Sequence, residues 1–341
     1  MNLFIKKIFI FVFAPISLLF LFLIVWDPFK AFYYYSDKYD NSLVTLNREH
    51  VALEIFKHKH KETKYNSFII GSSRSHAFKI SDWHKFGFNN DTSFHGFHFD
   101  GSDLGLFRMR NIIKYLDEET DQIKNLLLII DNSTFNEYEN PKIHLFIQPS
   151  DISKTSALDY YFTYIRASMN PKFIFVNIDY FFTKEKKSYM YNFFIRSKYF
   201  NYTNINTGDV YYGYDLEIER DSVHYYNQLI SKGVFFKRDT NALFQPVNDN
   251  ILKQQISRLK DIKDVVDLNN SNLKIVISPL YDQNKFNKKY KKILFSIFGK
   301  ECIYDFSGVN SFTENYTNFY ESSHYRPHVA REILRKVYSS E

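Results

Sequence analysis

The feature that most constrains this chain is an uninterrupted apolar run over residues 8–26, IFIFVFAPISLLFLFLIVW, which contains no charged side chain. A helix rises about 1.5 Å per residue, so this run is long enough to cross a bilayer's hydrocarbon layer, which is about 30 Å thick. Lys6 and Lys7 precede the run, and Asp27 follows it. The positive flank predicts that the N-terminus stays in the cytoplasm and that everything after the run lies on the other side. The run ends without a small-x-small cleavage site, which favours an uncleaved single-pass anchor (residues 1–26) over a signal peptide.

The rest of the chain divides into a linker, residues 27–63, and an α/β region, residues 64–341. The linker mixes aromatic and charged residues and has the pattern of one helix over 46–58. In the α/β region, short apolar strand patterns alternate with longer amphipathic ones. The predicted strands are 67–70, 93–99, 126–130, 273–277 and 302–306, and the predicted helices are 103–116, 250–268, 289–298 and 327–338. This alternation predicts a parallel sheet with helices on both faces.

Residues 149–245 interrupt the alternation and are crowded with tyrosine and phenylalanine. Aromatic residues form 19% of the whole chain, with 27 Tyr and 36 Phe. Such rings fill protein cores and also stack on sugars, and core filling is the commoner role for any single ring. We therefore expect an aromatic-rich insertion, partly helical, that is carried on the sheet domain.

Charge and cysteine content exclude some classes of function. The net charge of +6 is spread along the chain without a dense basic stripe, so no nucleic-acid partner is expected. The single cysteine, Cys302, rules out an intrachain disulfide. His58 and His60 form one closely spaced pair, and His95 and His98 form another. No acid or further histidine completes either set, so we expect no metal and no other cofactor.

The segment GSSRS, residues 71–75, directly follows the first predicted strand. In parallel sheets, ligands bind beyond the carboxyl ends of the strands, and a helix that begins there presents backbone N–H groups that can stabilise an oxyanion. This position favours Ser73 as a nucleophile. The alternative is that the serines merely cap a strand-to-helix turn. The motif also differs from the G-x-S-x-G nucleophile elbow, because residue 75 is serine rather than glycine.

A second segment, ESSHY at residues 321–325, lies just before the last predicted helix. A nucleophilic serine needs a base, and a histidine base needs a partner that fixes its tautomer and stabilises its cation. A carboxylate three residues before a histidine can fold back onto the imidazole, so Glu321 and His324 are candidates for these roles. The alternative is a solvated surface acid followed by a histidine at the start of a helix.

Together, the two segments resemble the SGNH (GDSL-type) hydrolase superfamily, which has its serine near the first strand and its acid and histidine before the last helix. GSSR at 71–74 is similar to the first sequence block of that family, with Ser72 where aspartate is usual. FYESSHYRPHVAREIL at 319–334 is similar to the last block, with Glu321 where aspartate is usual. The resemblance implies a flavodoxin-like three-layer sandwich and a Ser-His-acid mechanism.

Two further stretches extend the resemblance. FHFDGSDLGLFRMRNIIKYL, residues 97–116, resembles the second block, and LLLIIDNSTF, residues 126–135, resembles the third, with isoleucine where a glycine is expected. The resemblance implies that Gly101 and Asn132 join Ser73 as donors to the oxyanion. Two arginines adjacent to the reactive pair are candidates for binding substrate, namely Arg74 and Arg326.

The anchored subgroup most similar to this chain includes proteins associated with O-acetylation of exported polysaccharides and with D-alanyl transfer to teichoic acids. The resemblance implies an esterase or O-acyltransferase in the bacterial cytoplasmic membrane, acting outside the cytoplasm on an acylated or acyl-accepting glycan beside other polysaccharide-assembly proteins. Two rival hypotheses stay open. One is a catalytically inactive glycan-binding or assembly subunit of the same fold, and the other is an anchored scaffold for envelope proteins.

Overall fold

The computed structural model describes residues 2–35, 39, 42–137, 139–192, 201–238 and 249–339. At its centre is a five-stranded parallel sheet in which the strands lie in the order β2-β1-β3-β6-β7. These strands are β1 (Ser67–Gly71), β2 (Gly96–Asp100), β3 (Asn125–Ile130), β6 (Asn272–Ile277) and β7 (Ile303–Asp305). Within this sheet the order is 2-1-3-4-5, the order of flavodoxin-like sheets, with a topological switch point between β1 and β3. The predicted α/β class with a parallel sheet is confirmed.

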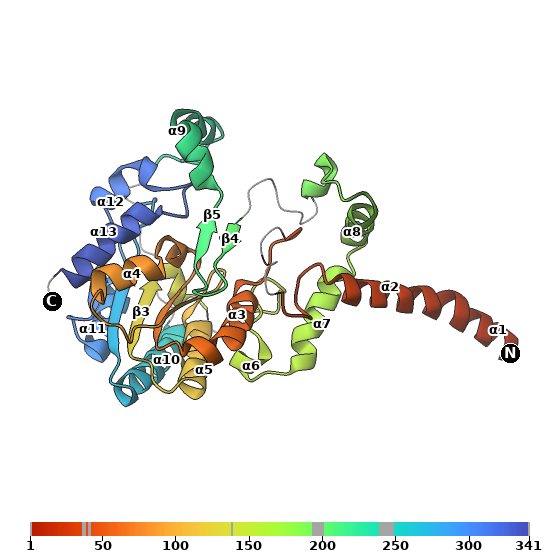
Figure 1. Cartoon of the computed structure of the whole chain (residues 1–341), viewed down its shortest axis with the longest axis horizontal. Coiled ribbons are helices and arrows are strands. Elements are labelled where there is room, and N and C mark those ends of the chain that lie inside the picture. Colours follow the sequence, from red (N-terminus) through yellow and green to blue (C-terminus); the bar gives the residue numbers. More distant parts are fainter. Residues whose placement is uncertain are drawn as a thin grey trace.

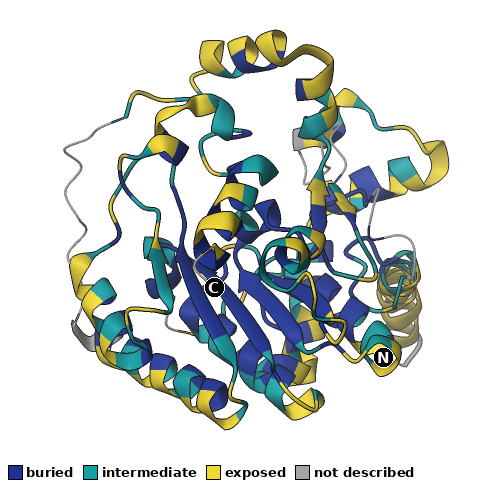
Figure 2. Cartoon of the chain, turned by 60° about the vertical axis from the view of Figure 1, so that its left-hand side comes forward, coloured by how far each residue is buried: buried dark blue, intermediate teal, exposed yellow. Residues whose placement is uncertain are grey.

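Helices cover both faces of the sheet (Figure 1). Successive side chains of β1 alternate between two hydrophobic cores, with Phe68 and Ile70 in one and Ile69 in the other. The first core is closed by α3 (Arg48–Thr63), α5 (Leu106–Glu119), α10 (Asp249–Leu268) and α11 (Lys288–Phe298), and the second by α4 (Ile80–Gly87) and α13 (Pro327–Tyr338). All residues of β1, β2 and β3 are buried, as expected for parallel strands covered on both faces (Figure 2).

Two helices, α3 and α5, differ by two or more residues at each end from the ranges that the sequence predicts. The helix expected over 103–116 begins only at Leu106. Asp103 has a left-handed backbone, with φ of +46°, and a right-handed helix cannot include it. The helix expected over 46–58 is α3, which starts one residue after Asn47 and runs further than predicted. The Asn47 side chain accepts a hydrogen bond from the third backbone N–H beyond it (3.2 Å) and thereby caps the helix.

Between β3 and β6 the chain leaves the sheet, in the region where the sequence predicts an aromatic insertion. The first part of this region is helical and consists of α6 (Ser150–Ser153), α7 (Ala157–Ser168) and α8 (Pro171–Thr183). The second part is a hairpin of β4 (Asn201–Thr203) and β5 (Val210–Tyr212), followed by α9 (Tyr214–Ser231). Figure 1 shows the first part beside the N-terminal helix and α9 at the top of the domain, away from that helix. Residues 193–200 and 239–248 of the predicted insertion and its flank lie outside the described residues.

The N-terminal apolar run forms one helix that projects from the domain (Figure 1). It consists of α1 (Asn2–Ile8), a π-helical turn η1 (Phe9–Phe13) and α2 (Ala14–Trp26). Pro15 lacks the N–H that would bond to the preceding turn, and this accounts for the widened turn just before it. The segment Lys6–Trp26 is long and apolar enough to span a membrane, and almost none of it is buried against the rest of the protein.

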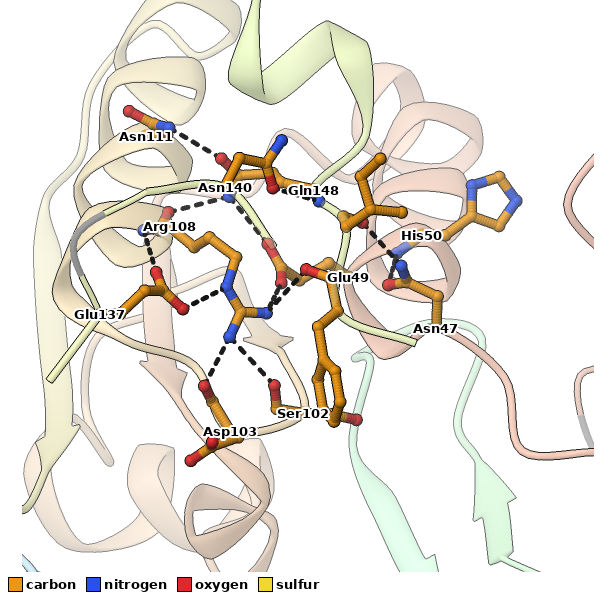
Figure 3. A network of polar contacts seen from close by, with 12 residues as sticks. Asn47, Glu49, His50, Ser102, Asp103, Arg108, Asn111, Glu137, Asn140 and Gln148 are labelled. Carbon is orange, nitrogen blue, oxygen red and sulfur yellow. Dashed lines mark hydrogen bonds and ion pairs between the residues drawn. The ribbon is translucent and has the colours of Figure 1, made fainter. Parts of the chain in front are cut away.

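A buried polar network fixes the loop between β2 and α5 (Figure 3). Arg108 of α5 forms ion pairs with Glu49 of α3 and, at 2.7 Å, with Glu137. The same guanidinium donates to the backbone carbonyl of Ser102 at 3.2 Å and to that of Asp103. The side chains of Arg108 and Glu49 are each 1% exposed. An arginine is tolerated at this depth because its N–H groups meet acceptors and its charge is neutralised.

We predict that Arg108→Ala lowers the free energy of unfolding by about 3–5 kcal/mol, because it leaves buried carboxylates without their counter-charge. Arg110, on the same helix, provides a matched control. It pairs with Asp261 at the surface, where the two side chains are 30% and 28% exposed. Arg110→Ala should therefore cost less than about 1 kcal/mol. Urea unfolding of both variants in detergent, followed by circular dichroism, measures the difference, and equal losses would contradict the role given to Arg108.

Candidate active site

Ser73 stands at the carboxyl end of the central strand. β1 ends at Gly71, and the chain turns at once into a short 3₁₀ helix, η2 (Ser73–Ala77), which Ser72 caps. A Cβ at Gly71 would lie only 2.8 Å from the Cβ of Ser75, so the tight turn requires glycine. Ser73 is the first residue of η2, and the N–H of such a residue has no acceptor inside the helix. Its hydroxyl and backbone N–H therefore lie at the edge of the sheet where ligands bind in such folds.

His324 and Glu321 meet Ser73 from the other end of the chain. Oγ of Ser73 lies 2.8 Å from Nε2 of His324, and Nδ1 of His324 is hydrogen-bonded to Glu321. An ionised carboxylate only accepts, so the proton of the neutral imidazole lies on Nδ1, and Nε2 accepts from the Ser73 hydroxyl. The side chains of His324 and Glu321 are 27% and 24% exposed, so a substrate can reach them from solvent.

The electrostatics of Glu321 favour its charged form. Burial acts to raise the pKa of Glu321, but the hydrogen bond and the attraction to His324 outweigh it, and the pKa lies below its ordinary value. The backbone N–H of Ser323 also donates to the second carboxylate oxygen at 2.7 Å. Glu321 is therefore ionised near neutral pH, and a carboxylate in this position stabilises an imidazolium.

Tyrosines of α9 hold the loop that carries His324. Within the loop, the backbone N–H of Tyr320 donates to the carbonyl of His324 at 2.8 Å. The Tyr225 hydroxyl donates to the carbonyl of Tyr320 at 2.8 Å, and the Tyr226 hydroxyl donates to that of Phe319 at 3.0 Å. Part of the aromatic insertion thus positions the acid–histidine loop, a role that the composition alone does not reveal.

A polar chain that the sequence analysis did not single out lies beside the Ser73–His324 pair. The Tyr212 ring is centred 5.7 Å from that of His324, and its hydroxyl lies 2.7 Å from Nδ1 of His76. Nε2 of His76 lies 2.6 Å from Asp100, and Arg48 pairs with both oxygens of Asp100 at 2.8 and 2.9 Å. Because the carboxylate only accepts, His76 carries its proton on Nε2, and its Nδ1 accepts from the Tyr212 hydroxyl. This chain fixes the Tyr212 ring beside the catalytic candidate His324.

One signal in the sequence points to this chain of contacts. Asp100 is the last residue of β2 and lies in register with Gly71, the last residue of β1. A charged residue at the end of β2 is therefore expected to lie near Ser73, which follows the end of the adjacent strand β1. Burial acts to raise the pKa of Asp100, but the charge of Arg48 and the hydrogen bonds from His76 and Arg48 outweigh it and hold that pKa well below its usual range.

The other two predicted oxyanion donors are engaged elsewhere. The N–H of Gly101 donates to the carbonyl at the end of β1 at 3.2 Å and continues the sheet. The side-chain amide of Asn132 donates to the carbonyl of Lys285 at 3.1 Å and accepts from the N–H of Asn287 at 2.9 Å. Asn132 thus ties the end of β3 to the loop after β6. Gly101 and Asn132 are therefore bonded within the protein, and the backbone N–H of Ser73 is the predicted oxyanion donor that stays next to the Ser73–His324 pair.

The two predicted substrate-binding arginines are both paired within the protein. Arg74 forms an ion pair with Asp131, which joins the ends of β1 and β3 and neutralises the charge. Arg326 lies 3.6 Å from Asp215 at the start of α9, and both side chains are partly exposed. The two arginines are exposed to a similar degree, 23% for Arg74 and 21% for Arg326, but the partner of Arg326 is more exposed than that of Arg74. Within the described ranges, no group of three or more His, Cys, Asp or Glu residues is placed to hold a metal ion.

We predict that the polar chain makes stability depend on pH through His76. Burial lowers the pKa of His76 to about 4, below its ordinary value of 6.5. Between these two values the unfolded chain binds a proton at His76, whereas the folded protein keeps this histidine neutral. The stability that depends on neutral His76 is fully present above pH 6.5 and is lost as the pH falls from 6.5 towards 4. The excess stability of the wild type over His76→Gln should therefore shrink by up to about 3 kcal/mol between neutral pH and pH 4. Urea unfolding across this range measures it, and a pH-independent difference would refute the role of His76.

Comparisons with models of protein families, with curated proteins and with solved structures find no match to this chain. The sequence blocks and the geometry around Ser73 are therefore the features that bear on function. The site joins a hydroxyl, an imidazole and a carboxylate by hydrogen bonds in that order. Enzymes that transfer acyl groups through a serine use the same arrangement.

Proposed function

We propose that this protein is a membrane-anchored, SGNH-like serine esterase or O-acyltransferase that acts on an acylated or acyl-accepting glycan outside the cytoplasm. The observation that carries the proposal is the contact between Ser73 and His324, 2.8 Å apart in space and 251 residues apart in sequence, with Glu321 on the far nitrogen. The flavodoxin-like strand order and the position of Ser73 after β1 support the same family. The apolar N-terminal helix supports an anchor in the cytoplasmic membrane, with the positive flank of Lys6 and Lys7 inside.

The proposed reaction is acyl transfer through a covalent intermediate. The Ser73 oxygen attacks the carbonyl carbon of an ester while Nε2 of His324 takes the hydroxyl proton, and Glu321 stabilises the imidazolium that forms. The backbone N–H of Ser73 stabilises the oxyanion of the tetrahedral intermediate. Collapse breaks the ester C–O bond, and His324 returns the proton to the departing alcohol. Water or a sugar hydroxyl then attacks the acyl-serine, which makes the enzyme an esterase or a transferase respectively.

A second candidate function, a catalytically inactive glycan-binding or assembly subunit of the same fold, is favoured by one observation. The family resemblance implies Gly101 and Asn132 as oxyanion donors. In the structure, the N–H of Gly101 and the side-chain amide of Asn132 both form hydrogen bonds within the protein. An oxyanion hole with one donor instead of three stabilises the transition state less, because a single donor is worth about 3 kcal/mol. The two candidates predict opposite results for reactivity at Ser73.

We predict that Ser73→Ala and His324→Ala each reduce hydrolysis of p-nitrophenyl acetate by about 10⁴-fold or more, because nucleophile and base act as one unit. Glu321→Gln should lose a comparable factor, since the neutral amide no longer favours the Nδ1–H tautomer. Ser322→Ala changes a serine two residues before His324 and serves as the control, with activity near that of the wild type. Each variant is checked for folding by its thermal unfolding midpoint in detergent.

Labelling with a fluorophosphonate probe separates the two candidates directly. An active serine enzyme reacts covalently at Ser73, and labelling is lost in Ser73→Ala and in His324→Ala. A folded wild-type protein that takes up no label and hydrolyses no acetyl ester would overturn the enzyme proposal. Retained glycan binding in that case would support the inactive subunit.

A further inference from the structure

Helix α8 is docked on the last turns of the N-terminal apolar helix. Nε1 of Trp26 donates to Oδ1 of Asn177 on α8 at 3.1 Å. The ring of Phe181 on α8 packs edge-on against Phe22 and Trp26, with centroids 5.4 and 5.1 Å apart. Just beyond α2, the ring of Phe29 stacks on Phe173 at 5.0 Å. Figure 1 shows α8 at the side of the domain from which α2 leaves it.

The outer face of α8 is apolar and exposed. Phe175, Ile178 and Phe182 are spaced three and four residues apart and so share one side of the helix, and all three are exposed. They line a shallow hollow of about 580 Å³ together with Asp179, Lys187 and Tyr189. The opposite face, with Phe173 and Val176, is buried in the domain core. Soluble surfaces rarely gather several large exposed apolar side chains on one helix face, so this face is suited to an apolar partner.

The apolar surface of α8 is continuous with that of α2. Phe181 of α8 lines a second hollow with Leu21, Phe22, Val25 and Trp26, so the same helix contributes to a surface made mainly by the anchor. An anchor that crosses a bilayer ends at the lipid–water interface, where tryptophan is enriched. Side chains that touch Trp26 share the depth of that end of the anchor, and the exposed face of α8 belongs to the same helix as Phe181, which touches Trp26.

Basic side chains flank this apolar surface. Nζ of Lys184, which ends α8, lies 4.8 Å from the ring centre of Trp26 and 4.5 Å from that of Phe181. Lys187 follows and pairs with Asp179 at 2.7 Å, and Lys172 stands in the first turn of the helix. Lysines at the ends of an apolar helix reach the headgroup layer while their stems stay on apolar surface, and they attract anionic lipids.

We propose that α8 is an interfacial helix that inserts the Phe175–Ile178–Phe182 face into the headgroup boundary of the bilayer that α2 crosses. The occupant of this surface is the lipid bilayer, with anionic headgroups around the lysines. This inference rests on the membrane-anchor part of the proposed function and is independent of catalysis. A second attachment point beside the anchor stops the domain from rotating freely about α2 and fixes the side on which the candidate site faces the envelope.

The test places one fluorophore at a time on the full-length protein in vesicles of phosphatidylcholine and phosphatidylglycerol that contain a nitroxide-labelled phosphatidylcholine. With Cys302→Ser as background, Phe182→Cys carries a bimane label on α8. Leu216→Cys on α9 is the matched control, because the two side chains are 78% and 72% exposed but α9 lies at the top of the domain, away from the N-terminal helix. Leu18→Cys reports on the anchor itself, and Phe175→Cys gives a second reading on α8.

We expect strong quenching by the lipid nitroxide at positions 18, 175 and 182 and none at 216. Quenching at 18 without quenching at 175 and 182 overturns the interfacial helix while the anchor stands. A lack of quenching at 18 removes the anchor, and the inference falls with it. Ester hydrolysis, measured separately, has no bearing on either outcome.

Discussion

The parallel pairing of β1 with β2 and β3 is the constraint on which the candidate site depends. All residues of these strands are buried beneath helices on both faces, and apart from His98 of β2 the polar ones stand at the strand ends. In parallel strands the carboxyl ends share one edge. Ser73 follows β1, Asp100 ends β2 and Asp131 follows β3. The loop with Glu321 and His324 completes this edge from the C-terminal end of the chain.

Two arginines hold the end of β2 and the loop that follows it, and Arg108 is the buried one of the two. Arg48 binds Asp100 through both carboxylate oxygens, and Arg108 binds the backbone carbonyls of Ser102 and Asp103 while pairing with Glu49. Buried charges are costly to desolvate, and each of these is offset by a partner of opposite sign. These contacts fix the end of β2 and the loop after it, beside the strand that Ser73 follows, and a reactive group keeps its geometry only when the residues behind it are held in place.

The aromatic residues of the insertion serve two different surfaces, and their chemistry differs accordingly. Near the candidate site they are tyrosines whose hydroxyls form hydrogen bonds that position neighbouring groups. Tyr225 and Tyr226 hold the His324 loop through its carbonyls, and Tyr212 donates to His76. On α8 the exposed aromatics are phenylalanines, which have no polar group to lose on entering lipid. Many other aromatic rings of the chain fill the two large hydrophobic cores, which is the commoner role that the composition suggests.

Local pattern in the sequence determined the strands, most helices, the apolar N-terminal helix and the identity of the Ser73, His324 and Glu321 candidates, because periodicity and short spacing act within a few residues. It could not determine the start of α5, which depends on the left-handed backbone of Asp103. The tertiary structure alone decided that Ser73 and His324 meet across 251 residues. It also decided that His76 joins Asp100 to Tyr212. The hydrogen bond from the amide of Asn132 to the loop after β6 was likewise decided only by the fold. Hydrogen-bond partners are selected by which groups packing brings within about 3 Å, and a distance through space between remote segments is not encoded in either segment by itself.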